Sequence, residues 1–466
     1  FYRPPLSADR FTPRGRLLLS RFYRYRPPLN EMSSLTHTST QKMPQNGLSA
    51  VLLLALFCLW INNIPFLTGE NTGKQLATVG LIGCALIILL FFRPHLTLKG
   101  AIPFFFFAYL AYTTAVNYFV GLFNEPPLVF RDFADPVRIA GLLIFLLLGA
   151  ASSLQVQPRH LRIFLYFYIG VTFALLFEWI LSTPLVPHFF DLYITRGGRF
   201  SHTMTSVNYV WVTSLLALWA AFLLLLKREG LFDLPVISLT LALSILSLTL
   251  SGGRSAIVGF VAAFFVLLYF FLRHTEPRRL VAIFLSFALL ITFSFAVFDL
   301  AVLERSINRL NELFSLLQVR NPAEVPALDA RIAHWQTTWP IINDRLVFGH
   351  GSARAGTDIF DNTYLMTLYR YGLIGLALEC LIFISMLGIA ISRFHSHPGA
   401  PLALAFLLAL LLNGITSTPM HELKTPYIFA FLAGWLCVTS PKCVFQTKVA
   451  TDSRRSLPPI PRERCH

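Results

Sequence analysis

Long apolar stretches alternate with short polar segments along most of the chain. Each stretch is close to the length of about 20 residues that a helix needs to cross the hydrocarbon core of a bilayer. The pattern therefore predicts an all-α polytopic membrane protein with about 12 transmembrane helices. The predicted spans cover about 48–68, 75–92, 101–122, 134–150, 161–182, 206–226, 232–250, 254–272, 280–301, 363–392, 400–418 and 424–440.

The composition supports this class. Of the 466 residues, 55% are hydrophobic and 13% are charged, whereas about a quarter of the residues of a soluble domain are charged. A net charge of +15 could indicate nucleic-acid binding, but Lys and Arg lie in short loops and tails between the apolar stretches. That distribution is typical of membrane topology, so we expect no nucleic-acid partner. The sequence has no Cys and His spacing typical of a zinc site.

The distribution of Lys and Arg also predicts the orientation. Short loops on one side of the predicted spans carry most of the Lys and Arg residues, and loops rich in Lys and Arg are cytoplasmic in membrane proteins. The stretch YRPPL occurs twice before Met32, and Met32 or Met43 fits a start better, so we expect the residues before about Met32 to be upstream sequence without a role in the fold. The predicted organisation is a cytoplasmic tail at 1–47, transmembrane helices 1–9 within 48–301, a periplasmic loop at 302–362, helices 10–12 within 363–440 and a cytoplasmic tail at 441–466.

The periplasmic loop at 302–362 is predicted to be structured. Two stretches in it, beginning at Ser306 and Arg331, have the apolar spacing of short amphipathic helices, which we expect to lie on the outer membrane face. The loop breaks the charge rule because it carries several arginines. Either these arginines bind an anion, or a loop of about sixty residues is translocated regardless of its charge. The sequence leaves both interpretations open.

A tight turn separates two of the predicted spans. It has the sequence Ser251-Gly252-Gly253, and Arg254 opens the following span. A cation at the start of a helix opposes the helix dipole, so stability alone does not favour it. Arg254 is therefore either a phosphate-binding guanidinium just inside the outer membrane face or a side chain that snorkels to the interface.

Two further polar stretches fall on the same predicted side. Arg196, Arg199 and Asn208 precede a span, and the glycines between the two arginines let the backbone approach a ligand. A plain connecting loop explains these glycines equally well. His350 lies between two glycines, so we expect it to be exposed, mobile and a candidate proton acceptor.

The order of these motifs resembles a known family. An Asn before a span, Ser-Gly-Gly-Arg in an outer turn, and Arg-x3-Trp leading to Gly-x-Gly are followed by Asp-Asn-x-Tyr-Leu and by Tyr-Gly-Leu-Ile-Gly-Leu. In this order, from about Arg196 to Gly375, the chain resembles the O-antigen ligase and O-antigen polymerase family of bacterial inner-membrane glycosyltransferases.

The resemblance implies a reaction on the periplasmic face of the inner membrane. The donor is a glycan carried on undecaprenyl pyrophosphate, and the acceptor is a sugar hydroxyl, either of lipid A-core (ligase) or of another lipid-linked glycan (polymerase). The expected partners are these lipids and the surrounding membrane lipids, with no metal and no cofactor. A pyrophosphate leaving group requires charge stabilisation, and Asn208 and Asn362 are expected to support the site. The arginines that match this role are Arg196, Arg199, Arg254 and Arg331.

Asp361 is the first candidate for the general base that the acceptor hydroxyl needs. The family commonly has His before the Asn of this motif, whereas this chain has Asp361 before Asn362. Burial at the membrane face would favour proton uptake by this carboxylate, and nearby arginines would make it a poorer base. Asp and Asn are also favoured N-caps, so helix capping alone is an equal interpretation. His350 is the alternative base, and the Asp leaves ligase and polymerase both open.

Two glycines of the last motif, Gly372 and Gly375, lie within the predicted span 363–392. Small residues let helices approach closely in lipid. We expect these glycines to serve packing and assign them no chemistry.

A transporter of lipid-linked glycans is the alternative class of protein. Transporters usually carry ionisable groups or broken helices near the membrane midplane. The predicted spans contain few charges, and polar residues concentrate in the outer loops, which favours chemistry at the surface. The charged residues within the spans are Arg138, Glu178, Asp299 and Glu379.

Overall fold

The described part of the computed structural model is entirely helical. Where residues are described, no β-strand occurs, which confirms the predicted all-helical class. Five of these helices are long and apolar enough to cross a membrane. The predicted spans 48–68, 75–92 and 280–301 lie almost entirely outside the described residues, as does most of the loop before 326. The described ranges are 101–123, 130–151, 158–181, 207–227, 233–275, 326–351, 361–421 and 424–437, with a few single positions besides.

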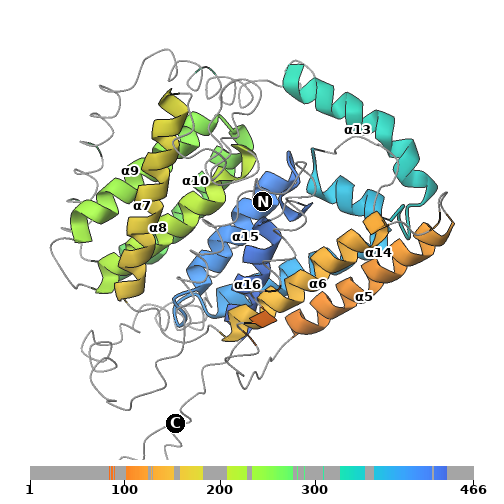
Figure 1. The fold of residues 1–466 in the computed structure, drawn as a ribbon, viewed down its shortest axis with the longest axis horizontal. Coiled ribbons are helices and arrows are strands. Elements are labelled where there is room, and N and C mark those ends of the chain that lie inside the picture. Colours follow the sequence, from red (N-terminus) through yellow and green to blue (C-terminus); the bar gives the residue numbers. More distant parts are fainter. Residues whose placement is uncertain are drawn as a thin grey trace, which may run out of the picture. The chain divides into compact units, whose positions relative to one another are not determined.

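The observed helices follow the predicted spans closely (Figure 1). The five candidate membrane spans are α5, most of α7, α9, α10 and α14. The second amphipathic stretch of the loop forms α13, with Pro340 inside its last turns. The elements are α5 Ala101–Leu122, α6 Phe130–Ala151, α7 Pro158–Leu181, η2 Val207–Tyr209, α8 Val210–Lys227, α9 Asp233–Ser251, α10 Arg254–His274, α13 Pro326–Asp344, α14 Thr363–Ser392, α15 Ala400–Gly414, η4 Pro419–His421 and α16 Thr425–Cys437.

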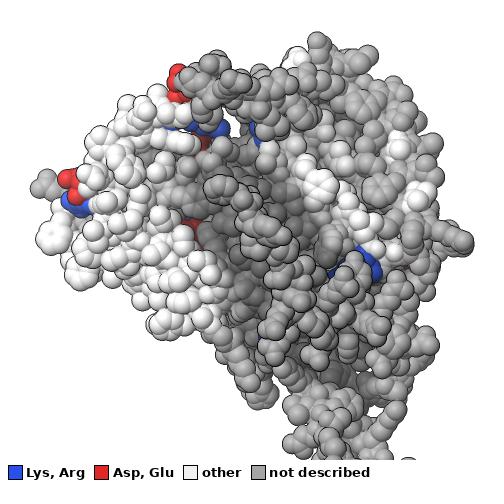
Figure 2. All heavy atoms as spheres, turned by 180° about the vertical axis from the view of Figure 1, so that it is seen from behind, with Lys and Arg blue, Asp and Glu red and all other residues white. Residues whose placement is uncertain are grey.

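Burial separates inner from outer helices. The helices α8, α15 and α16 are apolar and buried nearly all round, as expected of helices in the centre of a membrane bundle. By contrast, α5 and α10 expose large apolar side chains such as Phe104, Phe107 and Phe265. Figure 2 shows that, on the side of the molecule in view, little of the described surface carries Lys, Arg, Asp or Glu. An uncharged, apolar outer surface is suited to contact with lipid.

Two glycines allow α6 and α16 to approach each other closely. Where α6 and α16 cross, a Cβ atom on Gly149 would lie 1.9 Å from the carbonyl oxygen of Phe431, and one on Gly434 would lie 1.9 Å from that of Leu146. The two backbones therefore touch directly, as small residues allow in membrane helix pairs.

The helix α14 is bent sharply at Gly372. This residue has φ 63° and ψ −168°, a conformation essentially restricted to glycine. The two pieces of α14 approach each other closely at the bend. A Cβ atom on Gly375 would lie only 2.2 Å from the Cβ atom of Tyr371. The predicted span 363–392 thus has the observed bounds but is not one straight helix. The piece after Gly372 has about 20 residues and is long enough to cross a bilayer by itself.

The loop after α13 fills the bend. Backbone groups that a bend leaves without helical partners must be satisfied by neighbouring protein when they lie in a membrane protein. Here residues 346–351 supply those partners, and Tyr112 of α5 donates a further hydrogen bond to the Tyr371 carbonyl (2.9 Å). The two glycines expected to serve packing do so, and Gly372 also creates the bend. The four backbone bonds run from the amides of His350, Gly351, Leu373 and Ile374 to the carbonyls of Tyr369, Arg370, Leu346 and Val347.

Candidate active site at the start of α14

The first turn of α14 is held by Asn362. Its side-chain Oδ1 accepts a hydrogen bond from the Leu365 amide (3.0 Å), which makes Asn362 the N-cap of the helix. Its Nδ2 donates to the Ile415 carbonyl (2.9 Å), and Thr363 Oγ1 donates to the Ser417 carbonyl (3.1 Å). The capping interpretation is therefore correct for Asn362, which also fastens α14 to the turn that follows α15.

The same turn binds the short helix η2. Asn413, at the end of α15, donates from Nδ2 to the carbonyl of Asn208 (3.1 Å), and the Tyr209 and Thr418 hydroxyls lie 3.4 Å apart. Asn208 and Asn362, the two predicted supporting residues, are thus hydrogen-bonded to neighbouring positions at the end of α15, Asn413 and Ile415. We call this set the polar junction, and its members are Asn208, Tyr209, Asn362, Thr363, Asn413, Ser417 and Thr418.

Arg331 of α13 and Asp361 lie together beside the polar junction. Arg331 Nε is 3.8 Å from Asp361 Oδ2, and the two side chains are 32% and 56% exposed. An exposed pair at this distance stabilises the fold by no more than about 1 kcal/mol, so it leaves both groups available to a substrate. Since Asn362 is the cap, Asp361 stands outside the helix and its carboxylate is not used for capping.

Arg254 is the first residue of α10 and follows the predicted tight turn. Gly252 has φ 56°, and the Gly253 amide donates to Ser251 Oγ (3.3 Å). The cap residue Gly253 has no side chain to cap the helix, and Arg254 is the first residue of α10, at the positive end of the helix dipole. The helix α10 also contacts η2, which carries Asn208. Arg196 and Arg199 lie outside the described residues.

His350 differs from the expectation of an exposed and mobile side chain. Its ring stacks on the ring of Tyr369 with centroids 4.8 Å apart, and Nε2 lies 2.8 Å from the Ile341 carbonyl oxygen. Its backbone amide donates to the Tyr369 carbonyl at the bend of α14. The correction has a physical reason: the two flanking glycines have positive φ and let the loop bind the bend tightly rather than swing freely.

A buried carboxyl group adjoins this region and was not among the predicted site residues. Glu379 lies in the piece of α14 after the bend and accepts a hydrogen bond from Thr367 Oγ1 (2.7 Å). The Thr367 Oγ1 atom also lies 3.1 Å from Nε2 of His421. An ionisable residue inside an apolar span is a signal in the sequence. Its partners could not be predicted, because the bend at Gly372 brings them together.

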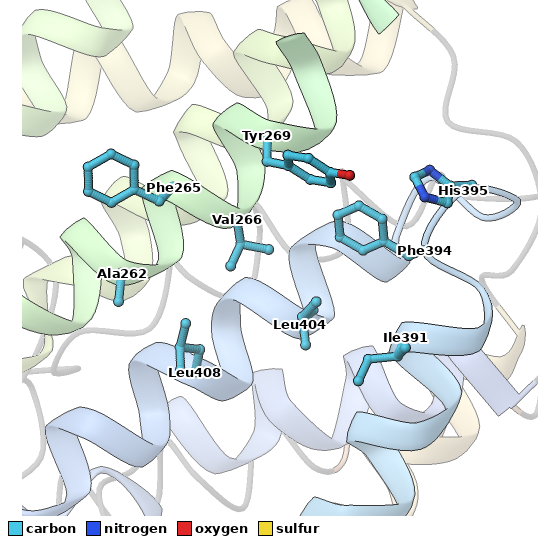
Figure 3. Close-up of a pocket in the computed structure, with 9 residues that line it drawn as sticks. All are labelled: Ala262, Phe265, Val266, Tyr269, Ile391, Phe394, His395, Leu404 and Leu408. Atoms are coloured by element: carbon cyan, nitrogen blue, oxygen red, sulfur yellow. The ribbon is translucent and has the colours of Figure 1, made fainter. Parts of the chain in front are cut away.

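The opposite ends of α10 and α14 form a different surface. A groove of about 600 Å³ lies there between α10, the end of α14 and α15 (Figure 3). We call it the apolar groove; His395 at its end is its one ionisable imidazole, and the rest of its lining is apolar or aromatic. Its lining residues are Ala262, Phe265, Val266, Tyr269, Ile391, Phe394, His395, Leu404 and Leu408.

No group of three or more His, Cys, Asp or Glu side chains among the described residues could hold a metal ion. The arrangement instead offers guanidinium groups, amides, hydroxyls and two kinds of proton acceptor, a carboxylate and an imidazole. These are groups that bind an anion and move a proton.

Residues 239–380 match the family model described as O-antigen ligase. The matched segment contains Arg254, Arg331, His350, Asp361 and Glu379, and ends before the 413–421 turn. No curated protein matches the chain. This match and the apolar helices together indicate a multi-pass membrane protein that resembles glycan-transferring enzymes. Over residues 239–380 the chain is thus similar to the O-antigen ligase family.

Proposed function

We propose that the protein transfers a glycan from undecaprenyl pyrophosphate to a sugar hydroxyl of lipid A-core on the periplasmic face of the bacterial inner membrane. The observation that carries this proposal is the position of the Arg331–Asp361 pair next to the polar junction, within the segment that matches the family. There an anion-binding group and a proton acceptor lie side by side. Both side chains are partly exposed, at 32% and 56%, and the proposal is that a lipid-linked substrate binds beside them.

The reaction requires charge stabilisation on the donor side. The acceptor oxygen attacks the anomeric carbon, and the bond from that carbon to the pyrophosphate oxygen breaks with its electron pair. Guanidinium groups that are already in place stabilise the departing pyrophosphate without reorganisation. The proposal gives this role to Arg254 and Arg331, together with Arg196 and Arg199, which lie outside the described residues. No metal and no cofactor are needed for this scheme.

The acceptor hydroxyl must lose its proton to a base. Asp361 and His350 are the two bases that the sequence proposes, and the structure limits both. Asp361 Oδ2 lies 3.8 Å from Arg331 Nε, so this side of the carboxylate faces a guanidinium group. The His350 ring is fixed between Tyr369 and the Ile341 carbonyl. Asp361 also orients Arg331, a role that the observed contact supports directly.

A polymerase that joins lipid-linked repeats is the second candidate. The observation in its favour is Asp361, which stands where the ligases commonly have His. Both reactions use the same donor and the same leaving group and differ only in the acceptor. The polar junction and the arginines would therefore act alike in both.

The experiment is a gene deletion with two readouts, the lipopolysaccharide ladder on a gel and the pool of lipid-linked glycan. Loss of the ladder with long chains accumulating on the carrier lipid supports the ligase. Loss of the ladder with single repeats still reaching the core supports the polymerase. An unchanged ladder and an unchanged pool would contradict both, and would leave transport of the same lipid as the alternative.

A further inference from the structure

Basic side chains gather at one end of the apolar groove. Arg273 and His274 belong to the last turn of α10, and Cζ of Arg273 lies 5.9 Å from the centre of the Tyr269 ring, which lines the groove. The ring centres of His274 and His395 are 6.2 Å apart. Three basic residues from two segments that are distant in sequence therefore lie together. We call Arg273, His274 and His395 the basic cluster.

The charge of the basic cluster is not balanced by an acidic side chain. Within the part of the chain that the structure describes, no carboxylate forms a salt bridge with a member of the cluster. Burial, followed by the charges of Arg273 and His274, lowers the pKa of His395, which lies in the connection between α14 and α15. These groups therefore repel one another when they are charged, and an anion among them would offset that repulsion.

Helix capping explains only part of the cluster. Basic residues in a last turn complement the helix dipole, and Nδ1 of His274 lies 2.6 Å from the carbonyl oxygen of Phe270 in that turn. His395 belongs to a different segment and cannot serve α10 in this way. Its place beside Arg273 and His274 adds positive charge that the end of α10 does not require.

The apolar groove beside the cluster is open to the surroundings of the protein. The lining side chains Phe265, Tyr269 and Ile391 are 61%, 54% and 59% exposed. They belong to α10 and α14, two of the candidate membrane spans, so their exposed faces are suited to lipid. The groove has a volume of about 600 Å³, within the range of about 300–1,000 Å³ that is common for ligand sites. It therefore offers a hydrocarbon chain a defined bed.

Apolar, aromatic and basic side chains follow one another along α10. Ala262 and Tyr269, at two ends of the lining, are about 10 Å apart along the helix axis, and Arg273 lies one turn, about 6 Å, further on. Figure 3 shows the Tyr269 ring and His395 toward the same end of the groove, with Ala262 at the other end. A phospholipid has the same order, from its acyl chain through the interfacial region to its phosphate. Tyrosine is typical of that interfacial level.

The predicted orientation supports an anionic lipid in particular. It places the ends of α10 and α14 at the cytoplasmic face, where the leaflet carries anionic lipids and basic pockets between transmembrane helices bind their headgroups. A free anion would contact the basic cluster but leave the groove unused. A zwitterionic lipid would fill the groove but bring no net charge to the cluster. An anionic lipid uses both parts.

We propose that the apolar groove and the basic cluster bind one anionic glycerophospholipid of the cytoplasmic leaflet. An acyl chain lies between α10, the end of α14 and α15, and the phosphate contacts the basic cluster. The lipid is bound without any chemical change, and it stabilises this end of the bundle because it binds only the folded protein. Arg254 and the polar junction lie at the other ends of α10 and α14, so this inference goes beyond the proposed glycan transfer and does not depend on it.

Native mass spectrometry of the full-length protein in detergent tests the headgroup. The protein is titrated with phosphatidylglycerol, or with phosphatidylcholine that has the same acyl chains. Wild type should bind phosphatidylglycerol at least about fivefold more tightly, the effect of one basic side chain near an anionic surface, and Arg273→Gln should lose most of this preference. Arg159→Gln is the matched control, because Arg159 is an exposed residue at the start of α7 on the same predicted face. It should keep the preference.

The acyl-chain contact needs a separate pair of variants. Ala262→Phe fills part of the groove and should weaken the binding of both lipids by about tenfold, the loss that corresponds to about two methylene groups returned from an apolar contact. Val261→Phe makes a similar change at the neighbouring position, which is 44% exposed and is not part of the groove lining. It should leave the affinity for both lipids unchanged.

Four results would overturn the proposal. They are equal affinity of wild type for the two lipids, equal loss of preference in Arg273→Gln and Arg159→Gln, unchanged affinity in Ala262→Phe, and displacement of phosphatidylglycerol by undecaprenyl phosphate at a lower concentration than by phosphatidylglycerol itself. The last result would assign the groove to the carrier lipid instead. Thermal midpoints without added lipid must stay near wild type, and His395→Gln replaces Arg273→Gln if that variant does not fold.

Discussion

The two ends of α10 and α14 have opposite characters. At their starts lie Arg254 and the polar junction, where side-chain hydrogen bonds join η2, α14 and the 413–421 turn. At their other ends the same two helices line the apolar groove, whose surface is almost entirely hydrocarbon (Figure 3). Both regions nevertheless belong to helices whose sequences are mainly apolar.

Helix length and helix shape explain the difference. α15 has 15 residues and spans about 22 Å, less than the 30 Å of a bilayer core. It ends at Gly414, and the bent start of α14 packs against this early end. Polar side chains can occupy the region between the end of α15 and the start of α14, because they form hydrogen bonds with backbone groups there. The apolar groove borders an unbroken stretch of α10, where the helix satisfies its own backbone and only apolar side chains face outward.

The largest effect is expected when the charge at the polar end of α10 is removed. Arg254→Gln should lower kcat for glycan transfer by about 10²- to 10³-fold, the usual loss when one stabilising donor at a developing negative charge is deleted. The assay is single-turnover transfer from lipid-linked glycan. The matched control is Arg273→Gln at the groove end of the same helix, which should keep near-wild-type activity. Equal losses in the two variants would remove the functional distinction between the ends.

The bend of α14 offers the next test. Gly372→Ala places a Cβ atom 2.2 Å from the Val347 carbonyl oxygen in a glycine-only conformation. Backbone strain and overpacking together should destabilise the fold by about 3 kcal/mol. A fall in the thermal midpoint measures this loss. Gly388→Ala, in the same helix with open space around its Cβ, should leave the midpoint unchanged. Equal midpoints for both variants would mean that the bend is not a fixed part of the fold.

Sequence patterns predicted the helices well and the site in part. Apolar length gave the bounds of α5 and α10, because a bilayer imposes that length on any crossing helix. Motif order gave Arg331 and Asp361, which the structure brings within 3.8 Å. The fixed position of His350 could not be predicted, since it depends on backbone bonds between a loop and a bend that are distant in sequence.

The hydrogen-bonded cluster of Thr367, Glu379 and His421 shows the same limit. Periodicity describes which face of a straight helix a residue occupies. Thr367 and Glu379 meet only because Gly372 interrupts that geometry, and His421 comes from a turn between two short helices. From the sequence alone, Gly372 does not indicate a bend, because the bend depends on residues that are neighbours only in the folded protein.

Acid should weaken the groove end of the bundle. Burial, and secondarily the charge of Arg393, lowers the pKa of His397 to about 4, and its Nδ1 accepts a hydrogen bond from the Gly399 amide (3.1 Å). Because the folded pKa is below the ordinary value of about 6.5, the neutral form stabilises the fold above pH 6.5, and this contribution is lost as the pH falls toward 4. Between pH 7 and 5 the loss should be about 2 kcal/mol.

Thermal midpoints measured from pH 7 to pH 5 test this expectation. His397→Gln should be less stable at pH 7 and should show a smaller decrease on acidification, since it has no proton to gain. The comparison with His395→Gln is informative, because that ring is exposed and its burial effect is smaller. An unchanged pH slope in His397→Gln would place the acid-sensitive group elsewhere in the protein.

The smallest effect is expected from filling the apolar groove. Leu404→Phe adds volume to a groove of about 600 Å³ that is open at its surface, so little overpacking results and stability should change by less than about 1 kcal/mol. Glycan transfer should stay within about twofold of wild type, because no group in the groove stabilises charge or moves a proton in the proposed reaction. Leu411→Phe, in the same helix but one turn from its polar end, is the matched comparison. Its carbonyl accepts the Tyr364 hydroxyl (2.9 Å), which anchors the first turn of α14, so a bulkier side chain there should disturb transfer more. If Leu404→Phe reduced transfer as strongly, the groove would belong to the working site, and the contrast between the two ends of α10 and α14 would be structural only.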